Sequence, residues 1–263
     1  ETMSAIAANL SRFRDAIVNF SGHKTPGELP AEFLLAQEGN LAQYYIPFDA
    51  VNTRALVVLV GITPGYVQWY NAVTTAQKIL RDGGDDALAL REAKKHGAFS
   101  GPLRNNLVKL LDGIGLAQML SLDSSAQLFT DHTGLVHCTS LYTQPLFVQG
   151  VNYNGKPHFS RSALLRASID EGFAVEAAAL KKAVFIPLGP VATEGVNVLV
   201  SRGVLDEVRV LSGLPHPSGA NMERISYFLG LKARDTLSSR TNADLLDQAK
   251  ASLLAKVSKL AFI

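Results

Sequence analysis

Short apolar runs alternate with segments of helical periodicity through the middle of the chain. The run at 55–61, ALVVLVG, is rich in valine and ends in glycine, which is typical of a buried strand in a parallel sheet. Further strands are expected at 134–141, at 183–189 and, running into a loop, at 208–219. Helical spacing of apolar residues is found over 67–96 (with a break at Gly83 and Gly84), 102–112, 160–182 and 190–203. This alternation predicts an α/β fold: a three-layer α/β/α arrangement with a short central parallel sheet.

Both ends of the chain have a helical pattern. The first twenty residues are expected to form an amphipathic helix. Its apolar residues, spaced three or four apart, are Ile6, Leu10, Phe13, Ile17 and Phe20. The segment AEFLLAQEG at 31–39 is interpreted as a second, short helix, and the last helices are expected at 223–233 and 242–260.

No internal repeat and no low-complexity linker divides the chain. A length of 263 residues suits one large domain or two small ones. We therefore expect a single domain over residues 1–263, with its core at about 50–235. The helices of residues 1–50 and the C-terminal helix of 240–263 would be additions to that core.

Composition excludes several classes of protein. With 47% hydrophobic and 18% charged residues, the chain has enough apolar material to fold without disulfides. A net charge of +2 is too small to predict nucleic-acid binding by itself. The single cysteine, Cys138, excludes an internal disulfide framework and indicates a reducing, cytoplasmic compartment. No apolar run is long enough to cross a bilayer, and we expect no membrane partner.

Unusual residues stand where three of the predicted strands end. They are GITPG at 61–65, HCTS at 137–140 and LPHPSG at 214–219. In parallel α/β sheets a ligand binds beyond the carboxyl ends of the strands. A functional site is therefore expected at that edge.

Four segments of the chain resemble the uracil-DNA glycosylase superfamily. GITPG at 61–65 and HPSG at 216–219 are similar to its two signature motifs, and GAFSGPLRNNLVKLLDGIGL at 97–116 is similar to the segment that carries a base-stacking aromatic. KKAVFIPLGPVATEGV at 181–196 is similar to the unit before the last strand. The four occur in the family's order and span about 55–230, roughly two-thirds of the chain.

The resemblance implies a monofunctional DNA glycosylase. Such an enzyme hydrolyses the N-glycosidic bond of a flipped deaminated base such as uracil, in base excision repair. The motif order is most similar to the thermostable bacterial and archaeal branch and the single-strand-selective branch. One cysteine excludes the iron–sulfur cluster of the thermostable branch. We expect no metal and no cofactor; the partner is DNA, single- or double-stranded, and no obligate protein partner is implied.

The resemblance assigns catalysis to Thr63 and His216. Neutral His216 would donate a hydrogen bond to the carbonyl oxygen of the departing base. Thr63 stands where the families usually carry Asn or Asp to place a water, but a hydroxyl is not a base at neutral pH. The alternative for His216 is a histidine that satisfies loop backbone groups.

The implied base-binding residues are Ile62, Pro64, Phe99 and Ser140. Phe99 matches the stacking aromatic, although a core phenylalanine is the alternative. Ser140 stands where the families often use Asn, and its single hydroxyl should discriminate less well between bases. Three further aromatics after the first motif are expected to pack rather than stack: Tyr66, Trp69 and Tyr70.

DNA contacts are implied for five residues: Gly65, Ser218, Gly219, Asn221 and Arg161. Ser218, with its backbone N–H, resembles a phosphate clamp, and it is also placed to cap a helix at 220–230. Small Ala220 takes the place of the usual apolar wedge, for which Asn221, Met222 or Arg224 could substitute.

The charge pattern gives modest support for a polyanion partner. Residues 133–169 contain no Asp or Glu. The basic residues of this stretch are Lys156, Arg161 and Arg166. A second basic cluster comprises Arg91, Lys94, Lys95 and Arg104.

Two other functions remain open from the sequence. The weaker residues Thr63 and Ser140 favour a member that binds DNA or a modified base without cleaving it. Small Ala220 is compatible with a hydrolase that acts on a free nucleoside. The sequence does not name the base.

Overall fold

The first valine-rich run forms the central strand of a parallel sheet. In the computed structural model, which describes residues 9–22 and 29–260, this strand is β3, Val57–Gly61, and all of its residues are buried. It pairs in parallel with β7, Val184–Pro187. The third strand of the sheet is β4, Val136–Ser140, and the strand order is β4-β3-β7. Burial of both faces explains why the run is apolar without alternation. The predicted α/β fold with a short parallel sheet is confirmed.

Residues that are far apart in the sequence combine into two compact units. Of the described residues, the first unit comprises those within 9–52, 62–100 and 138–179, and the second those within 53–61, 101–137 and 180–260. Strand β4 passes from the second unit into the first at Cys138. The expected single domain, with its core at about 50–235, stays a prediction.

Helix α9, Gly189–Ser201, packs on the sheet in the second unit. It follows β7 directly and contacts both β7 and β3. Pro190 suits the first helical turn, where no N–H is needed. The other helices of this unit, all expected from the sequence except the short α6, are α5 (Pro102–Gly113), α6 (Leu116–Met119), α10 (Met222–Phe228) and α11 (Ala243–Lys259). The 3-10 turns are Ser125–Phe129, Thr133–Leu135, Glu207–Arg209, Gly219–Asn221 and Arg234–Thr236.

The predicted strand at 208–219 is wrong except for a single bridge at Val210, and its first two residues belong to the 3-10 turn Glu207–Arg209. A parallel bridge joins Val210 to Phe185, and no strand follows in this described segment. Gly213 has a φ of +119°, which is outside the strand region. Two prolines further on lack the N–H that a ladder needs. The HPSG motif therefore lies in an irregular loop.

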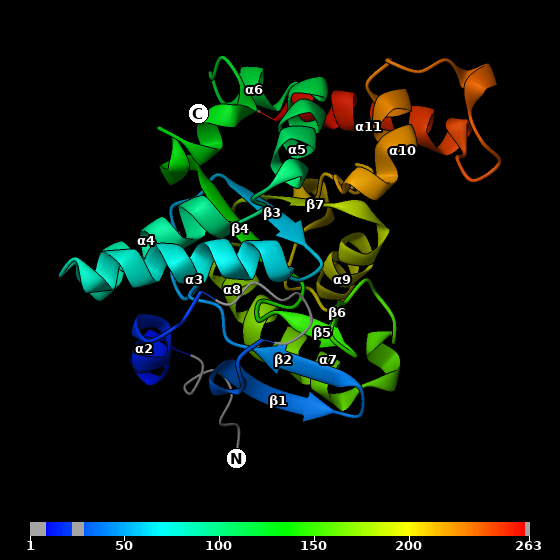
Figure 1. The fold of residues 1–263 in the computed structure, drawn as a ribbon. Coiled ribbons are helices and arrows are strands. Elements are labelled where there is room, and N and C mark those ends of the chain that lie inside the picture. Colours follow the sequence, from blue (N-terminus) through cyan, green and yellow to red (C-terminus); the bar gives the residue numbers. More distant parts are fainter. Residues whose placement is uncertain (1–8, 23–28, 261–263) are drawn as a thin grey trace. The chain divides into compact units, whose positions relative to one another are not determined.

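An antiparallel sheet that the sequence did not predict belongs to the first unit. Its strand order is β1-β2-β5-β6. The bounds are Leu34–Glu38 for β1, Leu41–Tyr44 for β2, Leu146–Val148 for β5 and Val151–Asn152 for β6. Figure 1 shows β1 and β2 as neighbouring arrows joined by a short connection.

The predicted helix at 31–39 is wrong. A 3-10 turn, Ala31–Phe33, leads directly into β1. Gly39 and Asn40 then join β1 to β2, and Gly39 adopts a φ of +56°. Gly-Asn between two runs is a hairpin signal, and pairing with β2 overrides the helical propensity of the alanine, leucines and glutamates.

The helices of the first unit agree with the sequence pattern. α3 (Tyr66–Arg81) and α4 (Asp86–Gly97) lie side by side (Figure 1), separated at the predicted glycine break, where Gly83 has a φ of +85°. The other elements are α2 (Leu10–Val18), a 3-10 turn (Phe159–Arg161), α7 (Ala163–Ser168), a π-helical turn (Ile169–Phe173) and α8 (Ala174–Ala179). Ile6, expected in the first helix, lies outside the described residues.

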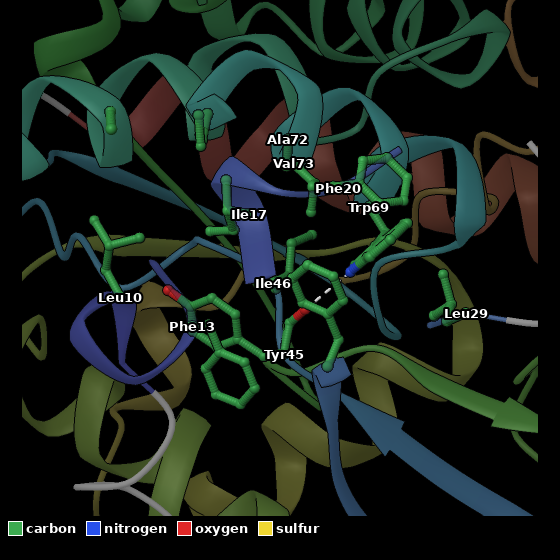
Figure 2. Close-up of a cluster of buried hydrophobic side chains, with 14 of the residues drawn as sticks. Leu10, Phe13, Ile17, Phe20, Leu29, Tyr45, Ile46, Trp69, Ala72 and Val73 are labelled. Carbon is green, nitrogen blue, oxygen red and sulfur yellow. Dashed lines mark hydrogen bonds between the residues drawn. The ribbon is translucent and has the colours of Figure 1, made fainter. Parts of the chain in front are cut away.

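An aromatic core fixes α3 in the first unit. Trp69 is fully buried, and its indole N–H donates to the carbonyl of Tyr45 at 2.9 Å (Figure 2). The Phe13 ring stacks on the Tyr45 ring with centroids 4.3 Å apart, and Phe20 meets Trp69 edge-on at 5.3 Å. The expectation that Trp69 packs rather than stacks on a base is confirmed.

Truncation of this core should destabilise the protein. Ile17, on α2, is fully buried in the cluster. We expect Ile17→Ala to lower the free energy of unfolding by about 2–5 kcal/mol, because it removes buried methyl groups and leaves a cavity. Denaturant titration followed by the fluorescence of the single tryptophan measures this change.

The matched control for this experiment is Val175→Ala. Val175 is 61% exposed on α8 of the same unit, so its truncation should change stability by less than about 0.5 kcal/mol. Equal effects of the two variants would contradict the assignment of the core.

Candidate functional site

The first motif lies in the turn that follows β3. The Thr63 hydroxyl donates to the carbonyl of Gln144 at 3.3 Å and accepts from the N–H of Leu146 at 3.2 Å. The N–H of Tyr142 donates to the carbonyl of Ile62 at 3.0 Å. These bonds bring the GITPG turn beside the segment that follows β4, as expected for neighbouring strand ends.

Its two bonds define what the Thr63 hydroxyl can do. A hydroxyl has one donor and two acceptor positions. Gln144 takes the donor, and Leu146 takes one acceptor. The second acceptor can receive a hydrogen bond from a water. Thr63 can therefore orient a water but cannot remove its proton.

The turn ends at Gly65, where α3 begins. The N–H of Gly65 donates to the side-chain oxygen of Gln68 at 2.9 Å, and the N–H of Tyr66 donates to the side-chain oxygen of Asn152 at 3.1 Å. Pro64 is buried in the turn. The Gly65 N–H thus already donates within the chain. The DNA contact that the sequence implied for Gly65 would therefore need another of its atoms.

Phe99 stands between α4 and α5 in the sequence, with a half-buried side chain. Its φ is +51°, a backbone region that bulky residues rarely adopt. The next residue, Ser100, is anchored to α3 twice. Gln68 donates to its carbonyl at 2.7 Å, and Asn71 donates to its hydroxyl at 3.0 Å. The ring keeps the partial exposure that stacking on a base requires.

Strand β4 ends in two buried hydroxyl residues. Ser140 is 6% exposed. Thr139 donates to the carboxylate of Glu176 at 2.7 Å. His137 and Cys138 are buried in the strand, as expected. Of the four residues predicted to bind the base, Ser140 and Pro64 are therefore buried, whereas Ile62 and Phe99 are partly exposed.

In the second unit, side chains and backbone groups fix the HPSG loop. The N–H of Ser218 donates to Nδ1 of His216 at 3.1 Å, and the Asn221 amide donates to the His216 carbonyl at 3.0 Å. The buried amide of Asn106, on α5, donates to the carbonyl of Pro217 at 2.9 Å. One bond thus holds the imidazole, and the other two hold the backbone of its loop.

Packing and hydrogen bonding together set the protonation state of His216. A Cβ placed on Gly189, at the start of α9, would lie 2.9 Å from Cβ of His216. Burial lowers the pKa of His216, so the imidazole is neutral at neutral pH. Because Nδ1 accepts the Ser218 N–H, the ring proton is on Nε2. His216 is a neutral donor through Nε2.

Ser218, Gly219 and Asn221 form the turn after the histidine. The Ser218 hydroxyl accepts from the N–H of Ala220 at 3.3 Å and so caps the 3-10 turn, as the sequence allowed. Its own N–H is bonded to His216, so the hydroxyl proton is the donor through which Ser218 can reach a phosphate. Gly219 is exposed.

The basic residues are only in part surface charges. Arg161 is exposed on the first unit. Lys94, however, donates to a backbone carbonyl of that unit and lies 5.7 Å from the centre of the Phe48 ring. In the second unit the Arg104 guanidinium lies 4.7 Å from the centre of the Phe129 ring. The second basic cluster is thus less available to a polyanion than its sequence suggests.

Sequence reasoning missed Gln68, Asn106 and Asn152. For Gln68 a signal existed, since it stands three residues after Gly65 in the position of a capping-box side chain. Asn106 lies within an apolar helical pattern and is 8% exposed. Asn152 comes from a two-residue strand that no sequence pattern marked.

Comparison with known proteins gives the family. The chain is 36% identical over 220 residues to the "Uncharacterized protein YoxB" of Bacillus subtilis (strain 168), a match that covers 82% of this chain and 86% of that protein. The chain belongs to the YoxB family. No protein-family model matches it, and no solved structure does.

Two further observations concern this member of the YoxB family. No helix among residues 9–22 and 29–260 is both long and apolar enough to cross a membrane. Within the same residues, no three or more His, Cys, Asp and Glu side chains come together as a group that could hold a metal ion.

The lowered pKa of His216 predicts a pH-dependent stability. The unfolded chain, whose histidine pKa is about 6.5, binds a proton before the folded one does. The stability that neutral His216 contributes is therefore present above about pH 6.5 and is lost as the pH falls below it. We expect His216→Gln to reduce the loss of unfolding free energy between pH 7 and pH 5.

Ser218→Ala is the control, because it keeps the backbone N–H that Nδ1 accepts. This variant should lose as much unfolding free energy between pH 7 and pH 5 as the parent. If His216→Gln loses as much unfolding free energy as the parent, the imidazole has the same pKa in the folded and the unfolded chain, and the prediction is contradicted.

Proposed function

We propose that this chain is a monofunctional DNA glycosylase of the uracil-DNA glycosylase type. It would hydrolyse the N-glycosidic bond of a flipped deaminated base, such as uracil, in base excision repair. The three-layer α/β/α arrangement of that superfamily belongs to the same proposal. The four similar segments, in the family's order, support it.

The state of His216 carries the proposal. Departure of the base places negative charge on its ring and carbonyl oxygens. A neutral imidazole with its proton on Nε2 is a suitable donor to such an oxygen. It donates a hydrogen bond and stays uncharged while the base departs. The Ser218 N–H at Nδ1 selects this tautomer, and burial favours the neutral form.

The reaction exchanges two bonds at the sugar. The bond from C1′ to the base nitrogen breaks, and its electron pair leaves with the base. The oxygen of a water bonds to C1′, one of its protons passes to solvent, and the base is protonated in turn. Thr63 would hold that water through its second acceptor position without taking a proton.

Phe99 would provide the surface on which the extruded base stacks. Base–aromatic stacking contributes roughly 1–3 kcal/mol per base and tolerates different bases. The half-buried ring suits this role. Ser140, with one hydroxyl, would make a single bond to the base edge, so we expect broad base selectivity.

A second candidate is a DNA-binding member that does not release bases. The engaged hydroxyl of Thr63 favours it, because the position lacks the Asn or Asp that the superfamily uses to place water. Salt-sensitive binding to a damaged duplex, with no base release, would distinguish it from the first proposal.

Base release tests the proposal directly. Single- and double-stranded oligonucleotides containing uracil, hypoxanthine or xanthine are incubated with the parent and with His216→Ala. We expect release by the parent and a rate about 10²–10³-fold lower in the variant, the effect of removing one donor to a developing anion.

His132→Ala is the matched control, since His132 is an exposed histidine of the same unit. It should keep the parent rate. Intact oligonucleotides throughout, beside a control enzyme that cleaves the uracil substrate, would refute the glycosylase; turnover of free nucleosides instead would favour a small-molecule hydrolase.

A further inference from the structure

The side-chain amide of Gln68 joins two segments that the sequence motifs treat separately. Gln68 is the third residue of α3. Its oxygen accepts from the N–H of Gly65, in the GITPG turn, at 2.9 Å, and its nitrogen donates to the carbonyl of Ser100 at 2.7 Å. Both polar atoms of one amide are thus used, one on each segment. All the residues involved belong to the first unit.

The segment at the second end of this bridge is strained. Phe99 precedes Ser100 and has a φ of +51°. A bulky residue keeps such a conformation when its surroundings fix it. Here Gln68 holds the Ser100 carbonyl, and Asn71, one helical turn further along α3, holds the Ser100 hydroxyl at 3.0 Å. Two amides from one helix therefore fix the backbone just after the strained residue.

The other end of the bridge depends on a missing side chain. A Cβ on Gly65 would lie 2.8 Å from the Gln68 oxygen and 3.0 Å from the Asn152 nitrogen. The first separation is shorter than real Cβ contacts, so a side chain at residue 65 would force the Gln68 amide to shift. The glycine of the GITPG turn therefore leaves the Gln68 amide in the position from which it accepts the Gly65 N–H.

We propose that Gln68 is a positioning residue that sets the placement of the Phe99 ring relative to the GITPG turn. It touches no substrate and acts through Gly65 and Ser100. The role of this placement in base stacking rests on the proposed function, because the Phe99 ring meets a base only in the proposed reaction. Its structural part, that the amide fixes Phe99, is testable without DNA.

The first test observes the Phe99 ring directly. The protein, which has 12 phenylalanines, is labelled with 4-fluorophenylalanine, and Phe99→Leu identifies the Phe99 signal in the ¹⁹F NMR spectrum. We expect Gln68→Leu to displace this signal, while the fluorescence of buried Trp69 remains that of the parent. A Phe99 signal unchanged in Gln68→Leu would overturn the proposal.

Gln77→Leu is the matched control. Gln77 lies on the same helix and also donates to backbone carbonyls, those of Ile17 at 3.0 Å and Phe20 at 2.7 Å. It makes the same kind of tether to a different segment. It should leave the Phe99 signal in place; equal displacement in both variants would indicate a general loosening of α3 and would overturn the assignment to Gln68.

Gln68→Glu keeps the shape of the side chain and supplies a pH test. As a carboxylate it can still accept from Gly65 but cannot donate to Ser100. When protonated it regains an O–H donor. The Phe99 signal should therefore be displaced at pH 8 and move toward the parent position as the pH falls through the pKa of the introduced carboxyl. A displacement that does not depend on pH would contradict the donor role.

Base release supplies the functional arm. We expect Gln68→Leu and Phe99→Leu each to raise KM about 5- to 150-fold, the range of one stacked base, and the double variant to add little. Additive effects would overturn the link to stacking. If the parent releases no base while the Phe99 signal still moves in Gln68→Leu, the proposed function fails and the positioning role stands.

Discussion

The buried hydrogen bond from the Trp69 indole to the Tyr45 carbonyl fixes helix α3, and the placement of Gly65 and of the Phe99 segment depends on that helix. At 2.9 Å and with Trp69 fully buried, water cannot replace this bond without cost. The apolar side of α3 is therefore set in one rotation against the aromatic core (Figure 2). Because side chains radiate from a helix at fixed angles, that rotation also sets where Gln68 and Asn71 reach. Packing of the aromatic core thus sets the position of the Gly65 turn relative to the Phe99 ring. No local sequence motif connects the two.

In the second unit the corresponding constraint is a close approach between backbones. The absence of a side chain on Gly189, with its φ of +86°, lets the His216 loop lie against the start of α9. That contact contributes to the burial of the imidazole, and the loop's own Ser218 N–H selects its tautomer. A glycine at the first position of α9 therefore has two consequences at once: it starts the helix, and it makes room for a neutral histidine.

The sequence predicts those parts of the fold whose signals are local. The continuous apolar runs predicted β3 and β7 correctly, the expected strand at 134–141 contains β4, and the glycine pair separates α3 from α4 as expected. Wrong predictions occurred where long-range pairing decides the structure. Residues 31–39 have helix-forming composition, but they pair with β2, which itself pairs with β5 about a hundred residues further along the chain. The candidate residues were found from motif order, whereas their hydrogen bonds, such as those of Gln68 to Gly65 and Ser100, follow from tertiary packing and could not be predicted.

The way the motif groups are bonded indicates which chemical step this chain can assist. The Gly65 N–H, the Ser218 N–H and the Thr63 hydroxyl proton are all used within the chain. The proposed function then relies on the Nε2–H of His216 and the hydroxyl proton of Ser218 in the second unit, and on the face of Phe99 in the first. Under the proposed function these groups would contact the base and stabilise its departing charge, and none of them could activate a water by removing its proton. A glycosylase built in this way gains its rate from stabilising the leaving group, so its rate should rise with the acidity of the base that departs.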